Sequence, residues 1–190
     1  GGSTTVADRR IRCHKTTGHG TQTFTQTVMN SCNPAFIEWG RRVGVDNLYT
    51  YIDKPGLTSK TGIDIAGEAG TIIHKKENVG EVELATMSFG QSFQITPMQM
   101  LRAAAAIVNG GNLVTPHFAI RTCAADKTTY SEFSYSTTQE AVSKETSDTM
   151  KDILRQVVEE GGGKNAYIEG FSIGGKTATS QKLPRGSGKY

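Results

Sequence analysis

Long apolar runs are absent from this chain of 190 residues. The longest covers residues 103–108 and follows directly on Arg102, whereas a helix that crosses a bilayer needs about 20 consecutive apolar residues. We recognise no signal peptide either. The residues by themselves therefore indicate neither a membrane span nor a cellular location.

Concentrated positive charge is also lacking. The chain has 21 Lys and Arg against 18 Asp and Glu, which leaves a net charge of +3. The basic residues are scattered, and their longest runs are pairs such as Arg9-Arg10. A nucleic-acid partner requires a concentrated basic face with interleaved aromatics, so we expect none. A hydrophobic content of 36% and a charged content of 21% predict one globular domain over residues 1–190.

Cysteine is scarce as well, and the three present are Cys13, Cys32 and Cys123. They allow at most one internal disulfide and leave a thiol over. Cys13-His14 together with His19 raises the question of a metal site. The spacing matches none of the common zinc patterns, and no fourth ligand is near in the sequence. We therefore expect no metal or other cofactor.

Apolar periodicity and capping signals predict helices at residues 22–29, 34–43, 46–54, 97–107 and 143–158. Asn33 is the expected N-cap of the second, and Thr96 with Gln99 forms a capping box for the fourth. Residues 56–80 read as a long glycine-rich loop. Residues 113–123 and 128–135 are expected to pair as a hairpin.

Residues 170–177, Gly-Phe-Ser-Ile-Gly-Gly-Lys-Thr, fit the phosphate-loop pattern on paper. Such a loop must open a long helix, and Pro184 and Gly186 argue against one. Phe171 and Ile173 instead alternate with small or polar residues, which predicts a strand that runs into Lys176. Small neighbours and an ammonium at a strand edge favour an extended peptide ligand with a carboxylate.

Two distant motifs carry a resemblance to penicillin-binding proteins. Ser31-Cys32-Asn33 resembles their Ser-x-Asn motif, and residues 176–179, Lys-Thr-Ala-Thr, resemble their Lys-Thr-Gly-Thr strand. The motifs occur in the family's order, about 145 residues apart. Residues 18–24 and 30–36, and the stretch 88–100, strengthen the match. The chain thus resembles a class B transpeptidase domain, and its last motif is similar to the sporulation-specific branch.

The resemblance implies an α/β (α+β) fold with helices packed on an antiparallel sheet. It implies a D,D-transpeptidase that cross-links peptidoglycan stem peptides and binds β-lactams, without a cofactor. By the same resemblance, Ser31 relays a proton, Asn33 hydrogen-bonds a substrate amide, and Lys176 supplies positive charge. The backbone N–H of Thr179 is expected to form half of an oxyanion hole. The residues expected to bind the substrate are Thr177, Ala178 and Thr179.

The family's nucleophile is missing, because no serine in the chain has lysine three residues on. In the family that Ser-x-x-Lys motif lies upstream of Ser-x-Asn. We therefore expect an internal fragment, a single truncated transpeptidase domain that forms no acyl-enzyme. Its parent is expected to be membrane-anchored at the extracytoplasmic face, with no anchor in this chain. An unpaired central strand would favour an oligomer or a swapped assembly, and Cys13 is expected to have an upstream disulfide partner.

Two other interpretations remain open. The chain could be a non-catalytic module that binds peptides or β-lactams through Lys176, or a scaffold lobe that docks a partner. In the second case Ser31 and Asn33 would merely cap a joint between helices. Residues 60–62, Lys-Thr-Gly, match the family tripeptide more literally than residues 176–178 do. They occur in a glycine-rich loop without strand alternation, so we assign them no catalytic role.

Overall fold

The computed structural model describes residues 1–138 and 141–180 of the chain, and we draw structural conclusions for these alone. The chain forms two compact units. The first unit comprises Gly1–Tyr49, Ile73–Phe93 and Thr149–Tyr190, and the second comprises Thr50–Ile72 and Gln94–Asp148.

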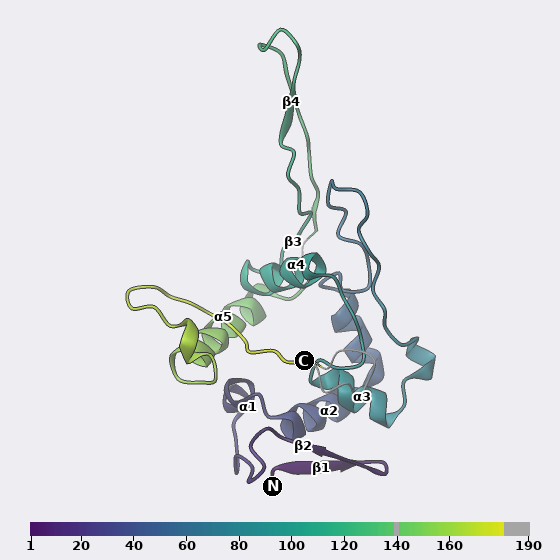
Figure 1. Ribbon diagram of the computed structural model, residues 1–190, viewed down its shortest axis with the longest axis vertical. Coiled ribbons are helices and arrows are strands. Elements are labelled where there is room, and N and C mark those ends of the chain that lie inside the picture. The colour runs from purple at the N-terminus through teal and green to yellow at the C-terminus, as the bar shows by residue number, and fades with distance from the viewer. Residues whose placement is uncertain (139–140, 181–190) are drawn as a thin grey trace. The chain divides into compact units, whose positions relative to one another are not determined.

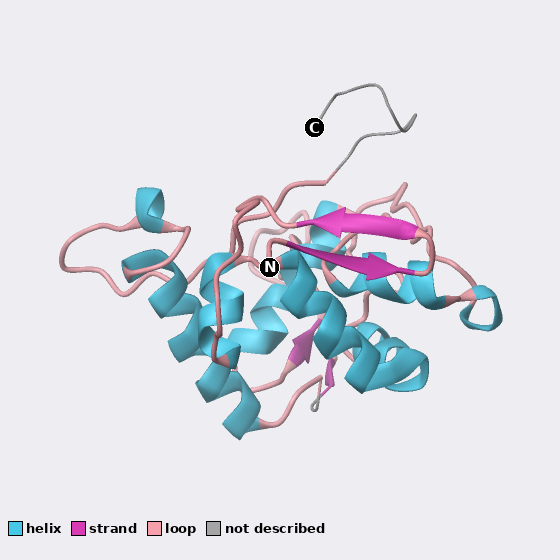
Figure 2. Ribbon diagram, turned by 90° about the horizontal axis from the view of Figure 1, so that it is seen from below, coloured by secondary structure: helices cyan, strands magenta, loops and turns pink. Residues whose placement is uncertain are grey.

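Helices dominate the described residues (Figures 1 and 2). The α-helices are α1 (Phe24–Asn30), α2 (Asn33–Asp53), α3 (Glu81–Ser88), α4 (Pro97–Val108) and α5 (Lys144–Glu159). Two 3-10 turns are η1 (Lys76–Asn78) and η2 (Lys164–Ala166). The strands are β1 (Ser3–Val6), β2 (Arg9–Arg12), β3 (Leu113–Val114), β4 (Arg121–Cys123), β5 (Tyr130–Glu132) and β6 (Thr137–Thr138). None of the described helices has the length and apolar character that a bilayer span requires.

The described strands pair only in twos, as antiparallel β1–β2, β3–β6 and β4–β5. The expected mixture of helices and antiparallel strands is therefore correct, but the strands are sparse and do not join into one sheet. Figure 2 shows β1 and β2 as paired arrows. Val6 at the end of β1 is fully buried against Ile37 of α2 and Ala85 of α3, and this contact forms one core of the first unit.

Helix α1 begins where local chemistry predicts. The Thr23 hydroxyl accepts the Gln26 amide at 3.2 Å, and the Gln26 side chain accepts the Thr23 amide at 2.9 Å, which completes a capping box. The predicted cap of α2 is wrong by one position. Asn33 is already helical, and the carbonyl of Cys32 accepts the amides of residues 35 and 36, each at 3.0 Å. Cys32, rather than Asn33, therefore precedes the first turn.

Helix α2 contains the break that separated the two predicted helices. Gly44 has φ 75° and ψ 166°, a conformation that interrupts a helix and suits glycine. In the first part of α2, Ile37 and Gly40 are buried. A Cβ atom at Gly40 would lie 1.7 Å from Ser88 Oγ, so the glycine allows α2 and α3 to approach closely. The sequence did not predict α3, because Gly80 precedes this helix and offers no side-chain cap.

A second core of the first unit lies between α1 and α5. Val28, Ile153 and Val157 are buried together, and Met29, Phe36 and Met150 pack around them. The apolar stripe predicted for α5 is therefore correct. Full burial of such a side chain stabilises a fold by about 1.5–3 kcal/mol relative to leaving it exposed. This packing fixes α5 beside α1, and Ser31 directly follows the last residue of α1.

The second unit is organised by α4, where the predicted capping box of Thr96 and Gln99 is present. Gln99 is fully buried, and its side-chain amide donates to the carbonyl of Ser59 at 2.7 Å and to Thr71 Oγ1 at 2.8 Å. One side chain thus ties the long loop of residues 56–72 to α4. The predicted hairpin is also present, since β4 pairs with β5 in the extended ribbon seen in Figure 1.

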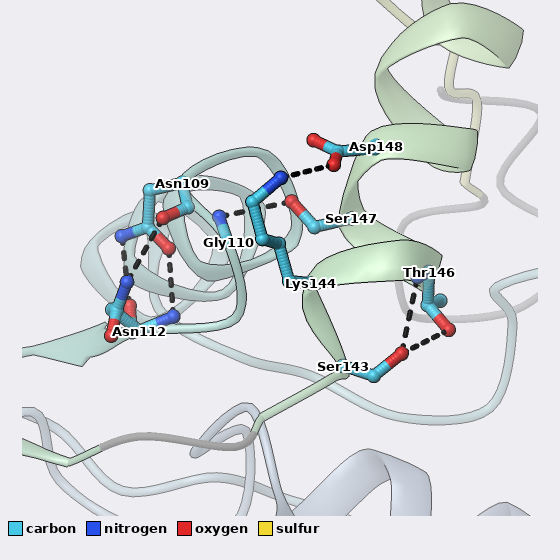
Figure 3. A network of polar contacts seen from close by, with 8 residues as sticks. All are labelled: Asn109, Gly110, Asn112, Ser143, Lys144, Thr146, Ser147 and Asp148. Carbon is cyan, nitrogen blue, oxygen red and sulfur yellow. Dashed lines mark hydrogen bonds and ion pairs between the residues drawn. The ribbon is translucent and has the colours of Figure 1, made fainter.

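The start of α5 is fixed by a polar network (Figure 3). The sequence allows either Ser143 or Thr146 as the cap. Ser143 Oγ accepts the Thr146 amide at 3.1 Å, so Ser143 is the cap. Ser147 is fully buried, and its hydroxyl accepts the Gly110 amide at 3.0 Å (Figure 3). The turn that follows α4 and the first turn of α5 are therefore joined by a hydrogen bond.

The predicted strand that runs into Lys176 is wrong, because residues 171–180 form neither a strand nor a helix. A strand is defined by a ladder of hydrogen bonds with a neighbour, and within the described residues no strand pairs with this segment. The Gly175 amide donates instead to the carbonyl of Leu154 at 3.1 Å, which attaches the segment to α5. Pro184 and Gly186 lie outside the described residues.

Candidate active site

Ser31 and Lys176 meet within the first unit although 145 positions separate them. Lys176 Nζ donates a hydrogen bond to Ser31 Oγ at 2.7 Å. The Ser-x-Asn and Lys-Thr-Ala-Thr motifs are therefore in direct side-chain contact.

Ser31 is presented by a strained turn between α1 and α2. Its φ of 49° and ψ of 47° are left-handed, a conformation that costs a residue other than glycine about 1–2 kcal/mol. The Ser31 amide donates back to the carbonyl of Val28 at 3.2 Å, and the buried Cys32 follows. The turn directs the chain from one helix into the next and leaves the Ser31 hydroxyl in reach of Lys176.

Lys176 has two further contacts to its own segment. Its Nζ donates to the Thr177 carbonyl at 2.8 Å and lies 3.4 Å from Thr177 Oγ1. Desolvation of the ammonium lowers the pKa of Lys176 below its ordinary value of 10.5. A lysine in this condition releases its proton more readily than a fully hydrated one.

The glycines before Lys176 lie against α5. A Cβ at Gly174 would lie 3.3 Å from Leu154 Cβ, so the segment packs closely on the helix at this position. At Gly175 a Cβ would lie 3.4 Å from Val158 Cγ2, which is an ordinary van der Waals contact. The predicted approach of a ligand to these small residues stays a prediction.

Gln91 holds the other end of the motif. Its side-chain amide donates to the Thr179 carbonyl at 3.1 Å, and Ser180 Oγ donates to Gln91 Oε1 at 3.4 Å. Thr177, Ala178 and Thr179 are exposed. The sequence analysis did not single out Gln91. The available signal was its place within residues 88–100, the stretch that resembles the class B group.

Asn33 lies two residues from Ser31 but makes a different contact. Its side-chain amide donates to the carbonyl of Arg12 at 3.2 Å, which ties the first turn of α2 to the end of β2. The predicted contact of Asn33 with a substrate amide stays a prediction. Of the three residues expected to be catalytic, two are in contact and the third is a close neighbour in sequence.

The Lys-Thr-Gly tripeptide at residues 60–62 is held by hydrogen bonds to Glu68. Thr61 is buried, and its amide and hydroxyl both donate to Glu68 Oε1, at 2.7 and 2.6 Å. The Gly62 amide donates to the other Glu68 oxygen at 3.2 Å. These contacts close a loop of the second unit, and the absence of a catalytic role for the tripeptide stays a prediction.

A separate group of side chains has the chemistry to hold a metal ion. The metal-binding atoms of Cys13, His14 and His19 all lie within 4.8 Å of one another. Burial raises the pKa of the Cys13 thiol, and the adjacent Cys32 thiol raises it further. Burial, followed by the charges of His14 and Lys15, lowers the pKa of His19. All three cysteines are free thiols, so the predicted upstream disulfide of Cys13 stays a prediction.

Comparison with known families decides the affiliation. The family model described as "Penicillin binding protein transpeptidase domain" matches residues 2–190. The chain belongs to this family. The resemblance drawn from the two motifs is therefore confirmed over nearly the full sequence.

Relatives within the family include sporulation and cell-wall proteins. The chain is 44% identical over 190 residues to stage V sporulation protein D of Bacillus subtilis (strain 168), and it spans 29% of that protein. It is 29% identical over 189 residues to penicillin-binding protein PbpB of Mycobacterium tuberculosis (strain ATCC 25618 / H37Rv), of which it spans 28%. The chain thus corresponds to less than a third of each of these family members.

The fold agrees with solved structures of the family. Penicillin-binding protein 3 of Mycobacterium tuberculosis, crystallised with ampicillin, matches the whole chain with a TM-score of 0.89 at 28% identity. The match covers 43% of the solved chain. The same protein has also been crystallised with aztreonam. Members of this family with the same fold therefore bind β-lactams.

Proposed function

We propose that this chain contributes to the active site of a peptidoglycan D,D-transpeptidase that acts in bacterial cell-wall cross-linking. The observation that carries the proposal is the 2.7 Å hydrogen bond between Lys176 Nζ and Ser31 Oγ. We propose that this transpeptidase acts at the extracytoplasmic face of the cell membrane, where peptidoglycan peptides are cross-linked.

Ser31 and Lys176 act as a proton relay in this proposal. While the Lys176 ammonium donates to Ser31 Oγ, the Ser31 hydroxyl proton is free to be given to the amine that leaves the peptide. Lys176 then replaces this proton and becomes neutral, a step that its lowered pKa assists. When a second peptide's amine attacks, its proton returns through Ser31 to Lys176. The relay is thereby restored.

The substrate's terminal carboxylate is the ligand that we assign to the exposed residues of the motif. The ammonium of Lys176 supplies charge, and the hydroxyls of Thr177 and Thr179 supply donors. Gln91 donates to the Thr179 carbonyl and so holds this end of the motif in place. The Thr179 N–H is the donor that we assign to the proposed oxyanion hole. Asn33 completes the set as the proposed ligand of a substrate amide, with its orientation set by Arg12.

Acylation requires a serine nucleophile, and the 190 residues contain no Ser-x-x-Lys sequence. We therefore propose that this chain by itself is not acylated. Incubation with fluorescent penicillin followed by denaturing electrophoresis should give no covalent band. A stoichiometric band would refute the proposal for the isolated chain.

The relay is tested in the longer protein that carries this chain. Lys176→Ala and Ser31→Ala should each slow acylation by penicillin by about 10²-fold or more, the usual contribution of a positioned proton donor. Lys164→Ala and Ser172→Ala are the matched controls, since neither residue contacts the relay, and they should acylate at the parental rate. Unchanged acylation in Lys176→Ala would exclude the mechanism.

A second candidate is a non-catalytic module that binds peptides or β-lactams. It is favoured by the exposed hydroxyls beside Lys176, which can hold a carboxylate without chemistry. Such a module would bind penicillin reversibly in calorimetry and release it intact on dialysis. Covalent and reversible capture by the longer protein thus separate the two candidates.

A further inference from the structure

Two arginines of β2 line one cavity in the first unit. Arg10 and Arg12 are two positions apart on a strand, so their side chains leave the same face of the β1–β2 pair. The cavity has a volume of about 310 Å³, at the lower end of the range of about 300–1,000 Å³ that is usual for small-molecule sites. We call it the arginine cavity, and its lining residues are Gly2, Ser3, Arg10, Arg12 and Thr16.

The arginine cavity has two positive charges that are not neutralised within the described part of the chain. Neither Arg10 nor Arg12 takes part in an ion pair of the described residues. The nearest acidic residue in the sequence, Asp8, instead pairs with Arg9 at 3.9 Å. Residues 1–20 contain four Lys and Arg but one acidic residue, an excess of positive charge equal to the net +3 of the whole chain. An anion is therefore the ligand that this cavity favours.

Backbone packing holds the walls of the arginine cavity. The Cys13 amide donates to the Gly2 carbonyl at 2.8 Å, and a Cβ at Gly2 would lie 2.0 Å from the Thr16 carbonyl oxygen. The loop after β2 therefore lies directly on the residue that precedes β1. Ser3 is opposite Arg12 in the register of the two strands, which places it on the same face. Ser3 and Thr16 thus add hydroxyl groups to a lining that the fold defines.

The donors of the two arginines remain available to a ligand. Arg10 Nε donates to Ser3 Oγ at 2.9 Å, which orients this guanidinium and leaves its terminal N–H groups for another acceptor. The Arg12 guanidinium has no hydrogen bond to any of the described residues. Guanidinium groups bind the oxygens of phosphate in pairs, with two parallel N–H···O bonds.

We propose that the arginine cavity is a binding site for a phosphate monoester or free phosphate. A phosphate monoester has a charge of about −1.5 to −2 at pH 7, which matches two guanidinium charges, whereas a carboxylate has a single charge. The hydroxyls of Ser3 and Thr16 supply further donors to the phosphate oxygens. The lining contains no aromatic side chain, so the site recognises the phosphate group and not a nucleobase stacked upon it.

Arg12 also connects the arginine cavity to the candidate active site. Its side chain lines the cavity, and its carbonyl accepts the Asn33 side-chain amide at 3.2 Å. A phosphate that orders Arg12 should therefore also be sensed by Asn33. The inference does not depend on the proposed transpeptidase function, because none of the lining residues is assigned to the relay or to the substrate.

NMR titration of the isotope-labelled chain with inorganic phosphate tests the site. At constant ionic strength, the backbone amides of Gly2, Ser3 and Thr16 and the Nε–H groups of both arginines should shift and reach saturation. The Asn33 side-chain amide should shift with the same midpoint. Acetate should bind more weakly, because its single charge leaves one guanidinium uncompensated. Shifts that do not saturate, or acetate that binds as tightly as phosphate, would overturn the proposal.

Variants on the two faces of β2 separate a site from general attraction of charge. Arg10→Gln and Arg12→Gln should each weaken phosphate binding about tenfold or more, since each removes charge-assisted hydrogen bonds. Arg9→Gln is the matched control, because it removes the same charge from the opposite face of the same strand and should bind like the parent. All three arginines are exposed, so each variant should keep the parental circular dichroism spectrum. Equal binding by all three variants would refute the site.

Two further probes identify the source of the phosphate. Glycerol 3-phosphate represents a soluble ester, and vesicles that contain phosphatidic acid present the same group on a lipid. Sedimentation with these vesicles that Arg12→Gln abolishes and Arg9→Gln retains would assign the phosphate to a lipid headgroup. Saturable binding of glycerol 3-phosphate without sedimentation would assign it to a soluble ester. Failure of inorganic phosphate, glycerol 3-phosphate and the vesicles alike would leave the arginines as a solvated strand face and end the proposal.

Discussion

The side-chain amide of Gln91 donates to the carbonyl of Thr179 at 3.1 Å, across 88 positions of sequence. Gln91 follows α3, and its own amide donates to the Thr86 carbonyl at 3.0 Å. The last residue of the Lys-Thr-Ala-Thr motif is therefore attached to the segment that directly follows α3. Together with the Gly175–Leu154 hydrogen bond, this contact holds both ends of a segment that has no strand partner among the described residues.

Removal of this attachment should loosen the motif without unfolding the first unit. In Gln91→Ala, the amides of Thr179 and Ser180 should exchange with solvent faster, because the carbonyl anchor is gone. Hydrogen exchange followed by NMR measures the effect. Gln156→Ala, which removes a glutamine from the surface of α5, should leave these amides unchanged. Equal rates in Gln91→Ala and the parent would contradict the assignment.

The pKa of Lys176 should depend on Ser31. Desolvation already lowers this pKa, and loss of the Ser31 oxygen removes a hydrogen bond that favours the charged ammonium. Ser31→Ala should therefore lower the pKa of Lys176 further. NMR titration of isotope-labelled methylated lysines measures the change. Ser172→Ala, in the same segment, should not alter it, and a rise in the pKa on Ser31→Ala would disprove the expected direction.

The lowered pKa of Lys176 also determines whether the stability of the chain rises or falls with pH. The folded chain binds fewer protons at Lys176 than the unfolded chain does between the folded pKa and 10.5. Stability must therefore rise with pH across that window, and the cost of desolvating the ammonium is fully present below it. Urea midpoints of the parent should show this rise. Lys176→Met should lack it, and identical slopes in the two proteins would speak against it.

Close packing of the motif on α5 predicts a cost for any side chain at Gly174. A Cβ there would lie 3.3 Å from Leu154 Cβ, so Gly174→Val should destabilise the chain by about 1–3 kcal/mol in urea unfolding. At Gly70 a Cβ would meet nothing within 4 Å. Gly70→Ala is therefore the control, with a neutral effect or a gain of about 0.4–1 kcal/mol. A Gly174→Val protein as stable as the parent would contradict the packing.

Gln99 should be the most sensitive position of α4. Truncation to alanine leaves the Ser59 carbonyl and the Thr71 hydroxyl without their donor, which costs about 1–3 kcal/mol for a buried polar group. The lost packing adds to this. Urea unfolding of Gln99→Ala measures the loss, and Met100→Ala, at an exposed neighbour, gives the baseline. Similar midpoints for the two variants would show that the loop is held in another way.

Local signals in the sequence predicted the local parts of the structure. The Thr23 side chain caps α1, which was predicted from its apolar spacing. Thr96 and Ser143 start helices because each side chain caps an amide three residues away, and such a contact needs no distant partner. Helix α3 was missed for the same reason, since Gly80 has no capping side chain. The β4–β5 hairpin was also predictable, because its strands are neighbours in sequence.

Features that depend on distant partners were predicted less well. The strand expected at residues 171–180 needs a neighbour that the described residues do not supply, and alternation alone cannot show whether one exists. The contact of Ser31 with Lys176 was reached only through resemblance to a family. Gln91 contacts a residue far away in the sequence, so its position became interpretable only in the fold.

The left-handed backbone at Ser31 opposes the stability of the turn to the chemistry proposed for it. A glycine there would relieve the left-handed conformation and should make the chain more stable, yet it would delete the oxygen that Lys176 contacts. The residue that would make this turn most stable is thus not the residue that the proposed relay needs. Ser31→Gly should melt at a higher temperature than Ser31→Ala while acylating as slowly, so the proposed relay is obtained at a loss of thermal stability in this turn.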